Sequence, residues 1–343
     1  MSVREIAKRA KVSIGTVDRV LHNRGRVSPE TKAKIEKIIK ELNYKPNFFA
    51  KNLSLGKTYR FGVLMPKLSQ DSNYWRLPAE GINRAQNDLQ TYKIKIQFYH
   101  YDRYSEESFR VAFKKVLREN LDGLLIAPVL SAAASEMINT IPDSIPYVFF
   151  DSTVPDSKPL TVIGQDYFQS GVLAAKLMRL LLKDEGCIAA IKILPEDYHI
   201  NERIRGFISS ISSKKNCGTK IYELDSNPKE SELKNLCNRI LSENKNLSGI
   251  FVSNAWTYLF AEFARSLKSR PKIHVIGYDL IKKNVEYIEN ETIDFVISQS
   301  PEIQGYSGIN TLFKHVVLKE KVNKKILVPL DIFTKENIRY KFN

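Results

Sequence analysis

Residues 3–22 of the chain read VREIAKRAKVSIGTVDRVLH. Apolar residues recur at helical spacing on both sides of a short break, at Val3, Ile6, Ala7 and Ala10 and again at Ile14, Val17, Val20 and Leu21. Ser13 stands at the break, where its hydroxyl can cap the second helix. Two small helices joined by a turn of about three to four residues form a helix-turn-helix, whose second helix can enter the major groove of DNA.

A third helix is predicted after this pair. Ser28 supplies an N-cap, Pro29 a first helical residue, and the stretch ETKAKIEKIIKEL turns Ile35, Ile38, Ile39 and Leu42 toward a small core. Pro46 prevents the helix from continuing.

A short segment follows at residues 47–56, NFFAKNLSLG, which Asn47 can begin and Gly56 can end as a helix. Isolated helices shorter than about 12–15 residues are marginal in water, so a partner is expected. Leu53 and Leu55 suit the minor groove of DNA, where apolar wedges enter between base steps.

Positive charge is concentrated in the same region. Residues 1–60 hold 15 Lys and Arg against 5 Asp and Glu, and so carry +10 of the chain's net charge of +15. A basic surplus in one small module is typical of proteins that bind phosphate backbones. Charge alone fits a soluble basic domain equally well, but charge and a helix-turn-helix together favour DNA.

From Tyr59 onward, apolar runs alternate with helical patterns. Strands are predicted at residues 61–66, 94–102, 123–129 and 147–152, and in a second series at 187–194, 219–225, 249–254, 273–279 and 294–299. Helical patterns separate them, at residues 77–90, 106–120, 132–141, 203–211, 230–244, 257–269 and 282–290. Such alternation predicts parallel sheets wound with helices, here in two lobes. The predicted fold class is therefore α/β, with an all-α head and a two-lobed body.

Polar side chains stand where the predicted strands of the body end. They are Asp151, Asp166, Asn254, Asp279 and Gln299, with Arg203 opening a helix and Tyr74 and Trp75 in the loop after the first strand. Ligands of open α/β sheets bind beyond the carboxyl ends of strands, and pockets favour domain interfaces. Carboxylates, amides and an arginine beside flat rings suit a polyhydroxylated ligand. Each residue alone has a simpler reading as a loop residue or helix cap.

The head resembles the DNA-binding head and hinge of the lactose-repressor (LacI/GalR) family of bacterial transcription regulators. The resemblance is carried by IAKRAKVSIGTVDRVLHNRGRVSPET and by ELNYKPNFFAKNLSLGKT. It implies a homodimer on a near-palindromic operator, with base reading by Ile14, Gly15 and Arg19, a phosphate contact by Thr16, and a minor-groove wedge at Leu53 with Asn47, Ala50 and Lys51 on the same hinge helix. The predicted domains are the helix-turn-helix at residues 1–45, the hinge at 46–58 and an effector domain at 59–335.

One residue of the second helix departs from the family pattern. Asp18 stands where the family usually has Ser, and a carboxylate near phosphates is repelled unless Arg19 neutralises it or a cytosine amino group donates to it. Gly15 has no side chain to read a base. Arg19 is therefore the strongest candidate for a guanine contact, which is worth about 1–3 kcal/mol of discrimination.

The body resembles the effector domain of the same family, which is shared with periplasmic sugar-binding proteins. The resemblance implies a ligand set of Asn73, Tyr74, Trp75, Asp151, Arg203, Asn254, Trp256, Asp279 and Gln299. Where the family usually has Asp after Asn254, this chain has Ala255 and Trp256, which exchanges a polar contact for a stacking surface. The set is closer to that of sugar or cyclitol sensors than to that of purine sensors.

Other classes of protein are less well supported. Gly56-Lys57-Thr58 lacks the preceding Gly of a phosphate-binding loop, because Lys51 stands there, and no GxGxxG follows a strand. Three scattered Cys and five His show no metal spacing, so no cofactor, metal or catalytic residue is predicted; His199 alone is placed near the rim of the cleft. A solute-binding protein would need an export signal, and a sugar-modifying enzyme would need an acid/base pair that the sequence does not single out among Asp151, Asp166 and Asp279.

The sequence therefore predicts a ligand-controlled DNA-binding regulator, most simply a repressor, with a sugar or cyclitol effector. No signal-peptide core and no apolar run of about 18 residues is found, so a bacterial cytoplasmic location without membrane contact is expected.

Overall fold

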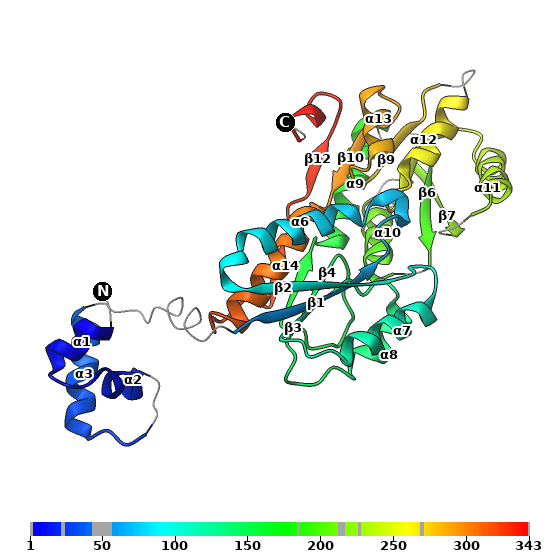
Figure 1. Cartoon of the computed structure of the whole chain (residues 1–343). Helices are drawn as coiled ribbons and strands as arrows, with labels where there is room; N and C mark the ends of the chain where they lie inside the picture. Colours follow the sequence, from blue (N-terminus) through cyan, green and yellow to red (C-terminus); the bar gives the residue numbers. More distant parts are fainter. Residues whose placement is uncertain are drawn as a thin grey trace. The chain divides into compact units, whose positions relative to one another are not determined.

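The computed structural model describes residues 3–21, 25–42, 57–183, 186–195, 197–211, 217–225, 228–267 and 271–341. The chain divides into two compact units, Met1–Thr58 and Tyr59–Asn343 (Figure 1).

The first unit contains helices α1 (Val3–Ala10), α2 (Ile14–Leu21) and α3 (Pro29–Glu41), which confirms the three predicted helices. The predicted caps are present: the backbone N–H of Thr16 donates to Ser13 Oγ at 3.1 Å, and that of Thr31 to Ser28 Oγ at 3.3 Å. The three helices share a core of Ile6, Ala7, Ala10, Val17, Val20, Ile35 and Leu42. The predicted hinge helix at residues 47–56 lies outside the described residues.

One lobe of the second unit is built on a parallel sheet with strand order β11-β5-β4-β3-β1-β2. The strands are β1 (Tyr59–Pro66), β2 (Ile94–Tyr101), β3 (Gly123–Ile126), β4 (Tyr147–Phe150), β5 (Thr161–Gly164) and β11 (Lys325–Leu327). The helical segments of this lobe are α5 (Gln70–Asn73), α6 (Arg76–Asp88), η1 (Gln90–Tyr92), α7 (Glu106–Leu117), α8 (Ser131–Ile138) and α14 (Pro301–Val316). The strands β1, β3 and β4 are almost fully buried, as expected when helices cover both faces of a parallel sheet.

The other lobe repeats this plan with the order β12-β10-β9-β8-β6-β7. Its strands are β6 (Gly186–Leu194), β7 (Cys217–Asp225), β8 (Leu247–Val252), β9 (His274–Tyr278), β10 (Phe295–Ser298) and β12 (Asp331–Phe333), of which β12 alone runs antiparallel to its neighbour among the described strands. Its helices are α9 (Tyr167–Leu182), α10 (Tyr198–Ile211), α11 (Glu230–Glu243), α12 (Thr257–Ser266), α13 (Lys282–Glu289) and η2 (Ile338–Lys341). The two-lobed α/β body is thereby confirmed.

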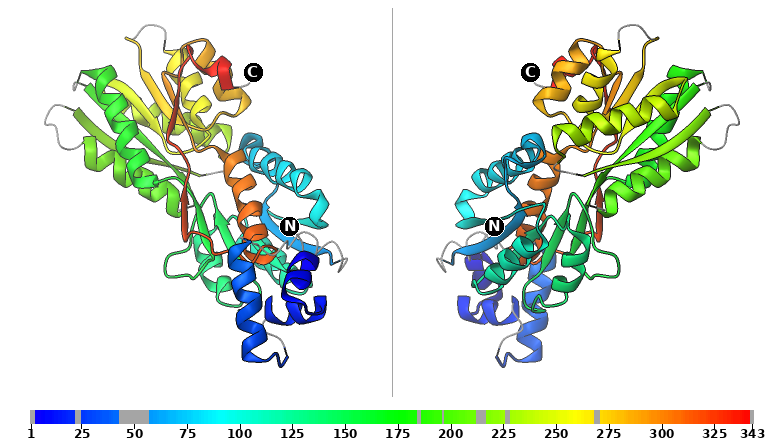
Figure 2. Two further views of the ribbon diagram at one scale, coloured as in Figure 1. Left: turned by 90° about the vertical axis from the view of Figure 1, so that its left-hand side faces the viewer. Right: turned by 90° about the vertical axis from the view of Figure 1, so that its right-hand side faces the viewer.

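The chain passes between the lobes three times, after β5, after β10 and between β11 and β12. Helix α14 therefore returns to the first lobe, where it lies beside α6, and the C-terminal segment runs from one lobe to the other (Figure 2). The elements β5, α9, α14, β11 and β12 are absent from the predicted set. The strands β5, β11 and β12 have only three or four residues each. The helices α9 and α14 each begin shortly after the chain crosses from one lobe to the other, and the alternation of strands and helices in the sequence does not show where these crossings occur.

Candidate functional site

Helix α2 presents the side chains that were predicted to contact DNA. Ile14 is 50% exposed although it is apolar, and Gly15, Asp18 and Arg19 are also exposed, while Val17 and Val20 on the opposite face are buried. Thr16 is half-buried, with Oγ1 at 2.9 Å from Ser13 Oγ. The remaining predicted contacts, Asn47, Ala50, Lys51 and Leu53, lie outside the described residues.

In the body, a small cavity lies where the carboxyl ends of strands from both lobes meet. It is lined by Asp71, Tyr74, Trp75, Arg103, Asp151, His199, Asn254, Ala255, Asp279 and Gln299. Its volume of about 20 Å³ gives room for about one water molecule. Side chains from the two lobes therefore contact each other across this central cavity, and the body is in a closed arrangement.

Arg203 and its partners form the second lobe's side of the site. Its Nη1 donates to the carbonyl oxygen of Ser253 at 3.0 Å, and its Nη2 donates to Gln299 Oε1 at 2.9 Å. Gln299 Nε2 in turn donates to Asp279 Oδ1 at 3.0 Å. The guanidinium lies 3.9 Å from the centre of the Tyr278 ring, which covers its face. Arg203 does not line the cavity itself but holds two residues that do.

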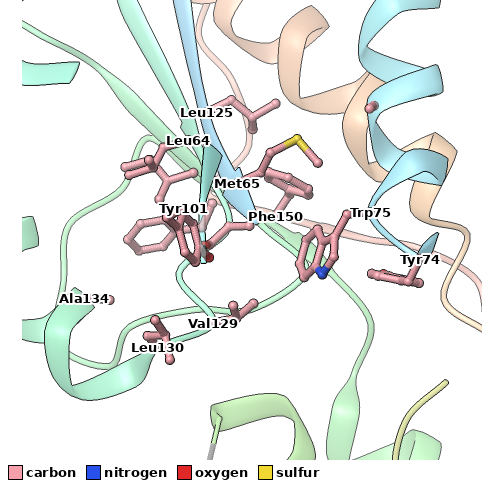
Figure 3. Packing of buried hydrophobic residues seen from close by; sticks show 14 of the residues in the cluster. Leu64, Met65, Tyr74, Trp75, Tyr101, Leu125, Val129, Leu130, Ala134 and Phe150 are labelled. Atoms are coloured by element: carbon pink, nitrogen blue, oxygen red, sulfur yellow. The ribbon is translucent and has the colours of Figure 1, made fainter. Parts of the chain in front are cut away.

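Tyr74 and Trp75 form the first lobe's side. Figure 3 shows Trp75 between Phe150 and Tyr74, and the ring centres lie 6.5 Å and 5.1 Å from that of Trp75. The Tyr74 hydroxyl donates to Asp151, and Trp75 Nε1 donates to Asp71 Oδ2 at 2.8 Å. The apolar cluster thus holds two rings at the cavity with their polar atoms bonded to carboxylates.

Asp151 and Asp279 occupy corresponding places in the two lobes, directly after β4 and β9. Both have left-handed backbone conformations, with φ of 66° and 70°. Such conformations cost of the order of 1–3 kcal/mol for residues other than Gly and occur preferentially at binding sites. Gln304 holds the first of these turns, because its Oε1 accepts from the Asp151 backbone N–H at 2.8 Å.

The sequence pattern missed three charged residues of the cavity region, Asp71, Arg103 and Asp197, and placed a fourth residue, His199, only near the rim of the cleft. Arg103 pairs with Asp71 (Nε to Oδ2, 3.1 Å) and reaches Asp197 across the lobes (Nη1 to Oδ2, 3.7 Å). His199, which was placed at the cleft rim, lies with Nδ1 at 2.6 Å from Asp197 Oδ1. All four are at least 94% buried. Arg103 follows the end of β2, so the strand-end signal that indicated Asp151 applied to it as well.

The pKa values of the buried carboxyls around the cavity are shifted in opposite directions. Desolvation raises the pKa of Asp279 to about 7, and it also raises the pKa of Asp151. Burial alone would raise the pKa of Asp197 too, but His199 and Arg103 hold it below its ordinary value. The charged form is therefore stabilised at Asp197, beside the cavity, and disfavoured at Asp151 and Asp279, although each of these two already accepts a hydrogen bond.

Besides Arg203, three residues singled out in the sequence do not line the cavity. Asn73 ends α5 and is exposed, and Trp256 is buried at the start of α12, so neither is among the residues lining the cavity. The structure does not bring these two into the predicted ligand set in this closed arrangement. Asp166 is the N-cap of α9, where its carboxylate accepts from the Gln169 N–H at 3.0 Å.

The remaining arrangement is rich in hydrogen-bonding groups and has aromatic walls. Acceptors are supplied by Asp71, Asp151, Asp279 and Asn254, donors by Arg103 and by Gln299, to which Arg203 donates, and flat apolar faces by Tyr74 and Trp75. Carboxylates and amides pair with hydroxyl groups, and rings cover the C–H face of a polyol. Within the described ranges no group of three His, Cys, Asp or Glu could hold a metal ion.

None of the described helices is long and apolar enough to cross a membrane.

Comparison with known proteins matches both parts of the chain. The family described as bacterial regulatory proteins, lacI family, matches residues 2–47, and the family described as periplasmic binding protein domain matches residues 61–321. The ribose operon repressor of Lactococcus lactis is 24% identical over 99% of this chain and 98% of its own. Catabolite control protein A of Staphylococcus aureus is 31% identical over 43% of each chain.

Among solved structures, a protein described as a LacI transcriptional regulator from Bacteroides fragilis superposes with a TM-score of 0.75 at 28% identity. The superposition covers 83% of this chain and 99% of that one. The chain therefore belongs to the family described as periplasmic binding protein domain through its body, and its head is a DNA-binding domain of the lacI family of bacterial regulatory proteins.

Proposed function

We propose that this DNA-binding transcription regulator senses a sugar or cyclitol in the central cavity. The observation that carries the proposal is the hydrogen-bonded chain from Arg203 through Gln299 to Asp279, which faces Tyr74 and Asp151 of the other lobe. One ligand with hydroxyl groups on both sides would bond to both lobes at once. The name of the ribose operon repressor, which is similar over nearly the full chain, agrees with a sugar as the effector class.

Control of DNA binding is a shift between populations of the body. A ligand that contacts both lobes binds the closed arrangement more tightly than the open one. This difference in affinity sets how far the ligand shifts the population toward the closed arrangement. A coupling of about 1–3 kcal/mol would change operator affinity about 5–150-fold. The cavity of about 20 Å³ has no room for a sugar in this arrangement, so the ligand must enter while the lobes are apart, and the lobes then close on it around a wider cavity.

The DNA contacts proposed for the head lie on the exposed face of α2. Arg19 is the candidate for guanine, Ile14 for apolar contact with a base edge, and Thr16 for a phosphate. A homodimer would present two such helices to the two halves of a near-palindromic operator. The proposed site of action is the bacterial cytoplasm, and the ligand is bound and released without chemical change.

The first experiment selects bound fragments from a random duplex pool with the purified full chain at moderate salt. A near-palindromic consensus is expected. A panel of pentoses, hexoses and cyclitols is then added to the selected duplex, and one of them should change its affinity. Binding without a consensus that fades as salt rises would contradict sequence-specific recognition. Consumption of the added sugar would indicate an enzyme, and a sugar that binds without changing operator affinity would favour a solute-binding protein.

A further inference from the structure

A second pocket lies in the body, apart from the central cavity. It has a volume of about 270 Å³, shares no lining residue with the central cavity, and is lined among others by Gln165, Tyr167, Tyr198, Glu202, Lys324 and Lys325. We call it the hinge pocket after the crossovers between the lobes, not after the hinge helix predicted at residues 47–56. Gln165 lies in the crossover from β5 to α9, Lys324 directly precedes β11 and Lys325 begins it, shortly before the last crossover. The first lobe contributes β11 and the second lobe contributes α9 and α10.

Gln165 is the central residue of this pocket. Its Nε2 donates to the carbonyl oxygens of Ser298 at 2.7 Å and of Pro329 at 2.9 Å, so one amide group connects all three crossovers. Two carbonyl acceptors require the NH₂ group on that side, which fixes the orientation of the amide. Its Oε1 is left without a hydrogen-bond partner among the described residues, although Gln165 is only 2% exposed. This oxygen has almost no accessible surface and does not face the open pocket, so Gln165 contributes to the pocket as the link between the crossovers.

The other walls of the pocket carry both signs of charge and aromatic surface. Lys324 and Lys325 are exposed cations where β11 begins, whereas Asp166 contributes a carboxylate from the N-cap of α9 and Glu202 one from the N-terminal half of α10. Glu202 already accepts from Arg205 at 2.6 Å, and Asp166 caps α9, so the acidic side is held in place. The rings of Tyr167 and Tyr198 meet edge to face with centres 6.3 Å apart. This combination suits a small molecule with a cationic donor and an anionic group.

Tyr167 connects the hinge pocket with the central cavity. Its hydroxyl donates to the carbonyl oxygen of Asp151 at 2.8 Å. Its ring centre lies 5.6 Å from that of His199 and 5.9 Å from the Arg203 guanidinium carbon. One side chain is therefore shared by the wall of the hinge pocket and by the supports of the central cavity.

We propose that the hinge pocket binds a free α-amino acid. Its ammonium group lies toward the carboxylates of Asp166 and Glu202, and its carboxylate lies toward Lys324 and Lys325. Because Gln165 joins the three crossovers, occupancy of the pocket changes how readily the lobes close. The binding itself is independent of the proposed sugar sensing, whereas its effect on the operator rests on that function.

The test is isothermal titration of the full chain with the protein amino acids, one at a time. At least one is expected to bind. The double variant Lys324→Ala with Lys325→Ala and the single variant Glu202→Gln should each weaken binding about tenfold or more, since each removes a charge-assisted contact. Lys321→Ala, an exposed lysine nearby that does not line the pocket, is the matched control and should leave affinity unchanged.

Asp279→Asn distinguishes the two cavities, because Asp279 lines the central cavity and not the hinge pocket, so this variant should leave amino-acid binding intact. Absence of heat with every amino acid would overturn the proposal. Binding that is lost in Asp279→Asn but unchanged in the lysine double variant would overturn it as well, by placing the ligand in the central cavity. Neither result bears on operator selection or on sugar binding, which are measured separately.

Discussion

Arg203 is a buried guanidinium whose hydrogen bonds are incomplete. Its two terminal nitrogens are bonded to Ser253 and Gln299, and its face lies on Tyr278. Its Nε has no hydrogen-bond partner among the described residues. A buried charge without full pairing is costly, so its presence here is explained best by a ligand that completes or reorganises its contacts.

Replacement of Arg203 by Ala should abolish the response to ligand and leave operator binding by the free protein intact. Truncation of a buried, hydrogen-bonded charge costs about 2–5 kcal/mol, which corresponds to roughly 30-fold to several-thousandfold in affinity. Titration with the active sugar and an operator shift assay measure the two properties. Arg205→Ala changes an exposed arginine of the same helix and serves as the control. Loss of both activities in Arg203→Ala alone would argue against a ligand role.

Asp279 should make stability depend on pH. Its pKa is raised by burial to about 7 from an ordinary 3.8, so the folded state retains a proton that the unfolded chain releases. The stability from this group is therefore full below about pH 4 and is lost as the pH rises through about 7.

The side chain in Asp279→Asn stays neutral at every pH and can still accept the hydrogen bond from Gln299. The free energy of unfolding of this variant should therefore lack the fall with rising pH that Asp279 causes. The difference in free energy of unfolding between the wild type and the variant should grow by at most about 1.4 kcal/mol per pH unit over that range. Urea unfolding at a series of pH values measures it. Parallel curves would contradict the raised pKa.

At the scale of elements, each lobe contains a helix pair in close backbone contact. In the first lobe, a Cβ at Gly81 of α6 would overlap the carbonyl oxygen of Glu302 in α14, and one at Gly305 would overlap that of Pro78. In the second, a Cβ at Gly171 of α9 would overlap the Arg203 carbonyl oxygen, and one at Gly206 of α10 would overlap that of Phe168. Glycine therefore allows each pair to approach, and in the second lobe the approach positions Arg203.

Gly206→Ala should push α10 away from α9. Overpacking of this kind costs about 1–3 kcal/mol, and because Arg203 is on the same helix, affinity for the ligand should fall as well. Thermal unfolding and ligand titration measure the two effects. Gly218→Ala is the control, since its Cβ would lie at an ordinary 3.7 Å from Cys187 Sγ. Equal melting temperatures for Gly206→Ala and the wild type would show that the helices separate without cost.

Helix α2 carries the predicted base contacts on one exposed face. Arg19→Ala should reduce preference for the selected operator over unrelated DNA by about 1–3 kcal/mol, or about 5–150-fold. Lys37→Ala removes an equal charge from the exposed surface of α3 and should leave that preference unchanged. Competition binding with operator and unrelated duplex measures it. An equal loss in affinity for both duplexes would make Arg19 a phosphate contact.

For the body as a whole, contacts across the lobes hold the closed arrangement in the absence of ligand. Ser72 and Tyr258 are 3.0 Å apart at their hydroxyl oxygens, and Arg103 reaches Asp197. A few such contacts set the balance between open and closed populations, because a hydrogen bond contributes about 0.5–1.5 kcal/mol.

Tyr258→Phe removes one of these contacts and should raise the open population about 2–10-fold. The chain has two tryptophans, Trp75 and Trp256, and both are buried, so opening should increase quenching of tryptophan fluorescence by acrylamide. Saturation with the active sugar should reverse the increase. Tyr340→Phe, which changes a tyrosine that is 65% exposed, is the control. Quenching equal to that of the wild type would show that this contact does not limit opening.

The sequence by itself determined the three helices of the head and most of the alternating strands and helices of the body. Ser13 and Ser28 cap their helices as predicted, because capping and helical periodicity are local properties. It also indicated Asp151, Asp279, Gln299 and Arg203, since strand ends are visible in the pattern and a resemblance assigned their roles.

Only the tertiary structure decided which of these side chains meet. Ser72 and Tyr258 are 186 positions apart, and Gln165 and Ser298 are 133 apart. The approach of Arg103 to Asp197 and the path of α14 back to the first lobe likewise follow from the three crossovers, and the packing of whole elements decides that Asn73 and Trp256 do not line the cavity. Contacts between residues so distant leave no periodic signal in the chain, because they depend on how whole elements pack and not on the residues beside them.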